Sequence, residues 1–77
     1  MKTALIPLAQ GFEEIEAITI IDVLRRAGVE VSVASLSGDT VEGAHKLKVK
    51  TDTNLEKVKS SEFDAIIFQF FSVIADF

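Results

Sequence analysis

The sequence predicts an α/β domain in which parallel β-strands pack against one long helix. Three segments in order support this prediction. An almost continuous apolar run covers residues 3–9, an amphipathic segment covers residues 13–27, and alternating valines begin at Val29. A strand, a helix and a strand in this order are typical of a right-handed βαβ unit, whose two strands are parallel.

The first strand, residues 3–9, ends at Gln10-Gly11. An apolar run of this length is typical of a strand that is covered on both faces of its sheet. Pro7 has no amide hydrogen to donate to a neighbouring strand. We therefore expect Pro7 at an irregular or unpaired position late in the strand.

The long helix, residues 13–27, carries a narrow polar stripe at spacings of three and four. The stripe consists of Glu16, Thr19, Asp22 and Arg26. Acidic residues at the start of the helix and arginines at its end complement the helix dipole. Gly28 suits the left-handed conformation that follows many helices.

The rest of the chain predicts a hairpin over residues 41–50, a short helix over residues 53–59 and a third buried strand over residues 63–68. Gly43 favours the hairpin turn, and Thr53-Asn54-Leu55-Glu56 matches a capping box. We expect the hairpin at the edge of the sheet. One long helix cannot cover both faces of three parallel strands, so we expect an incomplete domain.

Composition excludes several classes of function. The 77 residues carry a net charge of −4, whereas nucleic-acid surfaces need clustered basic residues. Lys46, Lys48 and Lys50 alternate with apolar residues, which indicates the solvated face of a strand. The apolar stretch 65–75 is too short to span a membrane, and no signal peptide is recognised, so a cytoplasmic location is expected.

The chain contains no cysteine, which excludes disulfides and thiolate nucleophiles within it. His45 is the only imidazole, and we expect a surface turn residue there and no metal site. The four glycines are scattered singly, so no phosphate-binding loop and no cofactor are predicted. Asp64 stands at the beginning of the third strand, whereas the phosphoacceptor of a response receiver stands at the end of that strand.

Ligands of open α/β sheets bind beyond the carboxyl ends of the strands, so residues 9–12 and the helix turn after them are the first candidates. Glu13 and Glu16 share a helix face, and one carboxyl could favour the protonated form of the other. Alternatively, Glu13 and Glu14 only complement the helix dipole, and Glu16 only ends the polar stripe. Both interpretations are open for these residues.

The segment 4–17, with the pattern G-x-E-E-x-E, resembles the opening of the ThiJ/PfpI (DJ-one-like) superfamily. The segments DVLRRAG at 22–28 and FDAII at 63–67 follow in the order of that family. The resemblance covers residues 1–68, and residues 69–77 diverge. It implies a flavodoxin-like (class I glutamine amidotransferase-like) layer, of which residues 1–77 form a single incomplete domain.

The resemblance also implies chemistry. Family members use a cysteine at a strand-to-helix elbow, with a glutamate of the first helix against the sulfur, and Glu16 stands at that glutamate's place. Where the family has Pro-Gly-Gly, this chain has Gln69-Phe70-Phe71. The implied parent is a cysteine-dependent glyoxalase or deglycase, or an oxidative-stress protein. This chain is then expected to be truncated and not catalytic, and we hypothesise a frameshift, a premature stop or an assembly artefact.

An alternative is a non-catalytic interaction module that associates with itself. The surfaces expected to pair are the helix 13–27 and the Phe-rich tail over residues 68–74. That tail is aromatic, uncharged and prone to β-structure, which favours aggregation when it is exposed. A discrete soluble homodimer would favour the module, and aggregation would favour the fragment.

Overall fold

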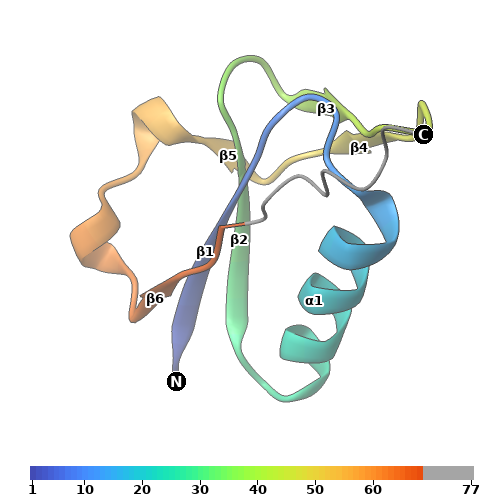
Figure 1. Cartoon of the computed structure of the whole chain (residues 1–77). Helices are drawn as coiled ribbons and strands as arrows, with labels where there is room; N and C mark the ends of the chain where they lie inside the picture. The colour runs from blue at the N-terminus through green and yellow to red at the C-terminus, as the bar shows by residue number, and fades with distance from the viewer. Residues whose placement is uncertain (69–77) are drawn as a thin grey trace.

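The computed structural model describes residues 1–68, and their main feature is a four-stranded parallel sheet in the order β5-β2-β1-β6 (Figure 1). The strands are β1 (Thr3–Leu8), β2 (Glu30–Ser35), β5 (Thr53–Asn54) and β6 (Ala65–Ile66). Helix α1 (Glu14–Arg26) connects β1 to β2. The predicted α/β class and the βαβ unit are confirmed.

The core lies between α1 and one face of the sheet. In the β1–β2 register Ile6 lies beside Val33, and both side chains are buried. Ala17 and Ile21 cover them from α1. The core cluster is Ile6, Leu8, Phe12, Ala17, Ile21, Val31, Val33 and Val41. Gly28 has a φ of 86°, as expected of the residue that follows the helix.

Pro7 lies late in β1, as predicted. The carbonyls of a strand alternate in direction, and the Leu5 carbonyl accepts a hydrogen bond from the Ile67 amide at 2.9 Å. The nitrogen of Pro7 therefore points to the same side of β1 as the Leu5 carbonyl, which is the side of β6. It lies beyond the pairing of β1 with β6, which joins Ala4 and Leu5 to β6. The missing amide hydrogen of Pro7 therefore removes no hydrogen bond from the strand pairs formed by residues 1–68.

The segment after the hairpin differs from the prediction. Thr53 and Asn54 form β5, which pairs with β2, and two 3-10 helices follow, η1 (Leu55–Lys57) and η2 (Ser60–Glu62). The predicted capping box is wrong, because the hydroxyl of Thr53, its expected capping residue, donates to the Asn54 carbonyl at 3.5 Å instead. The Asp52 amide donates to the Val33 carbonyl at 2.9 Å. This contact holds the chain extended beside β2, so a helix cannot begin at residue 53.

The prediction of a buried third strand is also wrong. β6 is two residues long, and both residues are exposed. Ile66 is 37% exposed and Phe68 63% exposed. Helix α1 is the only α-helix among residues 1–68, and it covers one face of the sheet. The side chains of β6 therefore remain in contact with solvent in this part of the chain.

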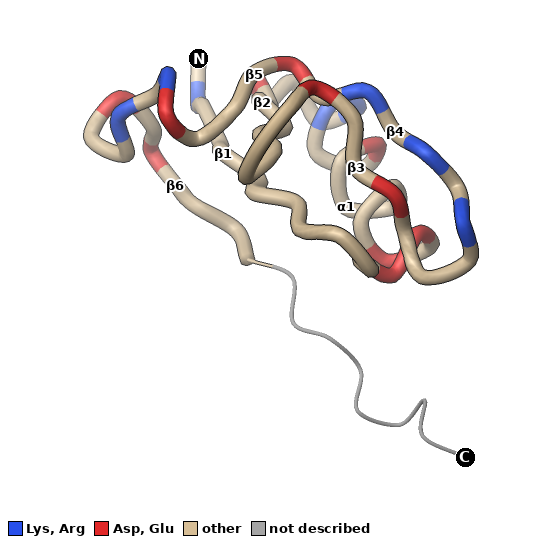
Figure 2. Tube along the Cα trace, turned by 90° about the horizontal axis from the view of Figure 1, so that it is seen from above, with Lys and Arg blue, Asp and Glu red and all other residues tan. Residues whose placement is uncertain are grey.

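The predicted hairpin is confirmed, but its predicted position is wrong. β3 (Thr40–Glu42) and β4 (Lys48–Lys50) form a separate antiparallel sheet and do not extend the edge of the parallel sheet. The hairpin lies against the β1–α1 connection instead. The Gly11 amide donates to the Glu42 carbonyl at 2.7 Å, and the Ala44 amide to the Phe12 carbonyl at 2.8 Å. Figure 2 shows the lysines of β4 in blue, and both Lys48 and Lys50 are exposed.

Candidate functional site

The carboxyl end of β1 leads into the candidate site. Gly11 has a φ of 84°, a conformation that favours glycine, and the Phe12 amide donates to the Ala9 carbonyl at 3.2 Å. This turn reverses the chain so that α1 begins at Glu14, beside the hairpin. Glu13, the residue before α1, and the carboxylates of its first turn therefore gather at this end of the sheet.

Glu16 is exposed on the first turn of α1. Glu13 is the capping residue of the same helix and is partly buried. The predicted interaction between Glu13 and Glu16 stays a prediction. The accessible position of Glu16 allows a group from outside residues 1–68 to approach its carboxylate.

Glu14 has surroundings that the sequence did not reveal. Its side chain is 10% exposed, although it is acidic and lies in the first helical turn. Its Oε2 accepts hydrogen bonds from the His45 amide at 2.7 Å and from the Leu47 amide at 3.3 Å. Its Oε1 lies 2.9 Å from Nδ1 of the His45 ring. Glu14 therefore joins α1 to the turn between β3 and β4.

The turn fits this carboxylate closely because it contains Gly43. A Cβ atom at residue 43 would lie 2.5 Å from Cδ of Glu14, well inside van der Waals contact, and would also collide with its Oε2. The Gly43 amide donates to the Leu47 carbonyl at 2.8 Å, which closes the turn around the bound oxygens. The turn is thus shaped for a carboxylate group.

The pairing shifts both acid–base equilibria. Burial raises the pKa of Glu14, but the His45 ring and the backbone amides of Glu14, His45 and Leu47 outweigh it and lower the pKa to about 2. The hydrogen bond that the His45 ring donates to the Glu14 carboxylate, together with the charges of Glu14 and Glu13, raises the pKa of His45 above its ordinary value. Glu14 is therefore a stable carboxylate and not a proton donor near neutral pH.

His45 lies in a turn and its side chain is 77% exposed, as predicted. Its contact with Glu14 spans 31 residues and has no local sequence signal, apart from the nearby glycine at residue 43. Within residues 1–68, no group of three or more histidine, aspartate or glutamate side chains could hold a metal ion.

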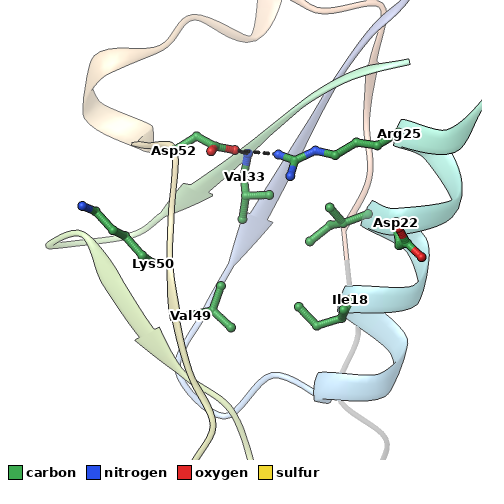
Figure 3. A pocket seen from close by; sticks show the side chains of 8 residues that line it. Ile18, Asp22, Arg25, Val33, Val49, Lys50 and Asp52 are labelled. Atoms are coloured by element: carbon green, nitrogen blue, oxygen red, sulfur yellow. Dashed lines mark hydrogen bonds and ion pairs between the residues drawn. The ribbon is translucent and has the colours of Figure 1, made fainter. Parts of the chain in front are cut away.

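A second feature is a hollow of about 290 Å³ between α1 and β4 (Figure 3). Its walls are the apolar side chains of Ile18, Ile21, Val33 and Val49, and charged residues lie around them. Arg25 and Asp52 form an ion pair there, with Nη2 and Oδ2 3.0 Å apart. Because these charges are already paired, we assign this hollow no chemistry.

The candidate site has no thiol, and the serine at the end of β2 is not accessible. The chain contains no cysteine. Ser35 is fully buried, and its hydroxyl donates a short hydrogen bond to the Gly38 carbonyl. Such a hydroxyl is occupied by its own turn and cannot reach a substrate. Glu16, on the first turn of α1, carries an exposed carboxylate.

Comparison with known proteins decides the family. The model of the DJ-1/PfpI family matches residues 2–68. The chain belongs to the DJ-1/PfpI family. It is 45% identical over 67 residues to the protein dj-1beta of Drosophila melanogaster, covering 86% of this chain and 36% of that protein. It is 39% identical over 59 residues to a deglycase of Pyrococcus horikoshii, covering 77% and 36%.

Solved structures agree with this assignment. The structure of oxidised DJ-1 from Toxoplasma gondii superposes with a TM-score of 0.86 at 39% identity, covering 91% of this chain and 39% of that one. DJ-1/PfpI proteins thus share the architecture described above, and the chain spans just over a third of the length of these relatives. Among residues 1–68, no helix is long and apolar enough to cross a membrane.

Proposed function

We propose that this chain contributes the glutamate side of a thiol-dependent deglycase site, and that it has no such activity by itself. The observation that carries the proposal is the absence of cysteine in a DJ-1/PfpI chain that keeps Glu16 accessible at the carboxyl end of β1. The reacting thiol then has to come from a second polypeptide or from sequence outside these 77 residues.

The chemistry follows from the properties of a carboxyl group beside a sulfur. A thiol reacts as its thiolate, and its protonation responds to neighbouring hydrogen bonds and charges. A hydrogen bond with one ionised partner is short and strong, so Glu16 can hold a thiol or an oxidised sulfur in one position. Glu16 then acts as a positioning residue. The relatives named deglycases support a glycated compound as the substrate, and glycated amino acids are the class that we propose to test.

The family glycines that would supply amides to the reacting oxygen are replaced here by Gln69-Phe70-Phe71, which lie outside the described residues. A complementing polypeptide would have to supply this function as well as the thiol. The proposal thus requires a partner that carries the remaining part of a DJ-1/PfpI domain.

The test is a complementation assay. The purified chain is incubated with a glycated amino acid, alone and with a cysteine-bearing polypeptide that matches the remaining length of the Drosophila relative. We expect no release of free amino acid by the chain alone, and release by the mixture. Activity of the chain alone would contradict the proposal, and so would an inactive mixture whose two polypeptides cosediment.

Self-association through α1 is a second candidate, because several large apolar side chains of this helix are exposed. Ile15 is 82% exposed, Ile18 40% and Val23 56%, and Leu47 of the neighbouring turn is 53% exposed. Exposed apolar side chains that lie together are typical of protein interfaces. The Phe-rich tail predicted to join this surface begins at Phe68, and its remaining residues lie outside the described part of the chain.

Sedimentation of the chain at several concentrations tests this candidate. We expect a discrete homodimer that Ile15→Glu dissociates, because the charge would be buried without a partner. Val29→Glu is not a suitable control, since Val29 packs against the core. Thr19→Glu, a change at an exposed position of the polar stripe, should leave the dimer less affected. A monomeric wild-type chain would contradict this candidate.

A further inference from the structure

We propose that Glu14 and the turn formed by residues 43–47 are a pH-sensitive latch, which holds the hairpin against the first turn of α1 and releases it when Glu14 becomes protonated. The latch consists of Glu14, Gly43, His45 and Leu47. It is independent of the proposed thiol chemistry, because it involves neither Glu16 nor a group outside the chain.

The geometry shows why Glu14 controls this contact. Both oxygens of the carboxylate are engaged, Oε2 by the amides of His45 and Leu47 and Oε1 by the His45 ring. A protonated carboxyl group would place a hydrogen on one of these oxygens, where an N–H donor now points. At least one of the hydrogen bonds from His45 or Leu47 would then be lost, which weakens the contact.

Among the described residues, the other hydrogen bonds between the hairpin and the β1–α1 connection involve no titratable group. They join the Gly11 amide to the Glu42 carbonyl, the Ala44 amide to the Phe12 carbonyl, and the Glu42 amide to the side-chain oxygen of Gln10. These groups have no ionisable partner in the contact. Among the described residues, pH can therefore act on this contact through the latch.

Gly43 leaves the space that the Glu14 carboxylate occupies in the latch. A methyl group at residue 43 would occupy the space of the Glu14 carboxylate. Gly43→Ala therefore expels the carboxylate while leaving Glu14 and His45 chemically unchanged. This variant separates the geometry of the latch from its charge.

The charges around the latch give the direction of its pH dependence. Glu14 faces His45 from α1, and Glu13 adds a second negative charge that acts on His45. Lys46 and Lys48 flank this part of the hairpin but are exposed. The pKa of Glu14 falls from 4.5 to about 2 on folding, so its contribution is complete above 4.5 and is lost as the pH falls through about 2.

His45 contributes in the opposite sense. Its pKa is raised above 6.5 in the folded chain, so its contribution is complete below 6.5 and is lost as the pH rises through the raised value. The latch is therefore strongest between about 4.5 and 6.5. On the alkaline side it weakens without opening, because the two backbone amides continue to bind Glu14.

Nuclear magnetic resonance of the isotope-labelled chain tests the proposal, since the single histidine gives an unambiguous imidazole signal. In the wild-type chain we expect a His45 midpoint above 6.5 and a Leu47 amide whose shift titrates at acidic pH. Glu14→Gln and Gly43→Ala should return the midpoint toward 6.5 and abolish the acidic titration of the Leu47 amide. Glu16→Gln is the matched control and should change neither.

Release of the hairpin is measured by hydrogen exchange of the Ala44 amide, which donates to Phe12 across the contact. Its protection should fall in Glu14→Gln and Gly43→Ala and persist in Glu16→Gln. The Thr3 amide, bound to Asp64 at the other end of the sheet, reports whether each variant is folded. A wild-type midpoint at the ordinary value overturns the proposal, as does wild-type Ala44 protection in a folded Glu14→Gln chain.

Discussion

Arg25 of α1 and Asp52 beside β2 form an ion pair in which the carboxylate has a second partner. Asp52 Oδ2 lies 3.0 Å from Arg25 Nη2 and also accepts a hydrogen bond from the Val33 amide at 2.8 Å (Figure 3). Asp52 therefore connects the helix, the sheet and the start of β5. The two contacts differ in how much they stabilise the fold. Both charged side chains of the ion pair are about half exposed, 48% and 50%, whereas the hydrogen bond from the Val33 amide is partly buried.

The first prediction follows from this difference. Asp52→Ala should lower the free energy of unfolding by about 1–3 kcal/mol, because the Val33 amide loses its side-chain acceptor. Arg25→Ala should cost about 1 kcal/mol, through the exposed ion pair and the hydrogen bond from Nη2 to the Val31 carbonyl at 3.1 Å. Urea denaturation followed by circular dichroism measures both variants. A larger loss in Arg25→Ala than in Asp52→Ala would contradict this ranking.

The second prediction concerns the two faces of the sheet. Ile6 is 2% exposed in the core, so Ile6→Ala should cost about 2–5 kcal/mol. Ile66 on β6 is 37% exposed, and Ile66→Ala should cost clearly less, about 1 kcal/mol. The same denaturation experiment compares them. Equal losses would mean that β6 is as buried as the core.

The third prediction concerns Lys46, which has a φ of 69° in the hairpin turn. A left-handed conformation costs about 1–2 kcal/mol for a residue with a Cβ atom, and glycine avoids this cost. Glycine also loses more conformational entropy on folding, which offsets part of this gain. Lys46→Gly should therefore raise the free energy of unfolding by between 0 and about 1 kcal/mol. Lys48→Gly, within β4, should destabilise the chain, and the opposite order of thermal midpoints would refute the turn assignment.

The fourth prediction concerns the amino end of β1. The Asp64 carboxylate accepts a hydrogen bond from the Thr3 amide at 2.8 Å, and this contact lowers the pKa of Asp64 below 3.8. Its stabilising contribution is therefore present above 3.8 and is lost as the pH falls through the lowered value. In Asp64→Asn the free energy of unfolding should fall less steeply as the pH is lowered below 3.8 than in the wild-type chain. An unchanged steepness would show that Asp64 does not contribute to it.

Local patterns in the sequence were sufficient for the elements of the βαβ unit. The polar stripe and Gly28 bound α1 to within a residue, and the apolar run gave β1. These features depend on near neighbours, which periodicity detects. The hairpin was also recognised from a local turn, but its position depends on backbone contacts with Gly11 and Phe12, about 30 residues earlier in the chain.

The features that the sequence did not predict depend on contacts between distant residues. The capping pattern at Thr53 was overridden by the pairing of Asp52 with Val33, which favours a strand there. The exposure of β6 follows from the lack of a covering element among residues 1–68. Glu14 was interpreted through the helix dipole, whereas its main partners lie in the hairpin turn. Glu16, in contrast, was a candidate from its place on the first helical turn, and only the family resemblance gave it a role beside a sulfur.

The most direct measurement of the central claim compares two variants of the chain in the complementation assay. Glu16→Gln removes the proposed supporting carboxylate, and Glu30→Gln removes an exposed carboxylate at the start of β2, at the opposite end of the sheet. We predict that Glu16→Gln strongly lowers the release of free amino acid and alters the pH profile of the remaining release, whereas Glu30→Gln changes neither the amount nor the profile. Equal activity of the two variants would contradict the role of Glu16.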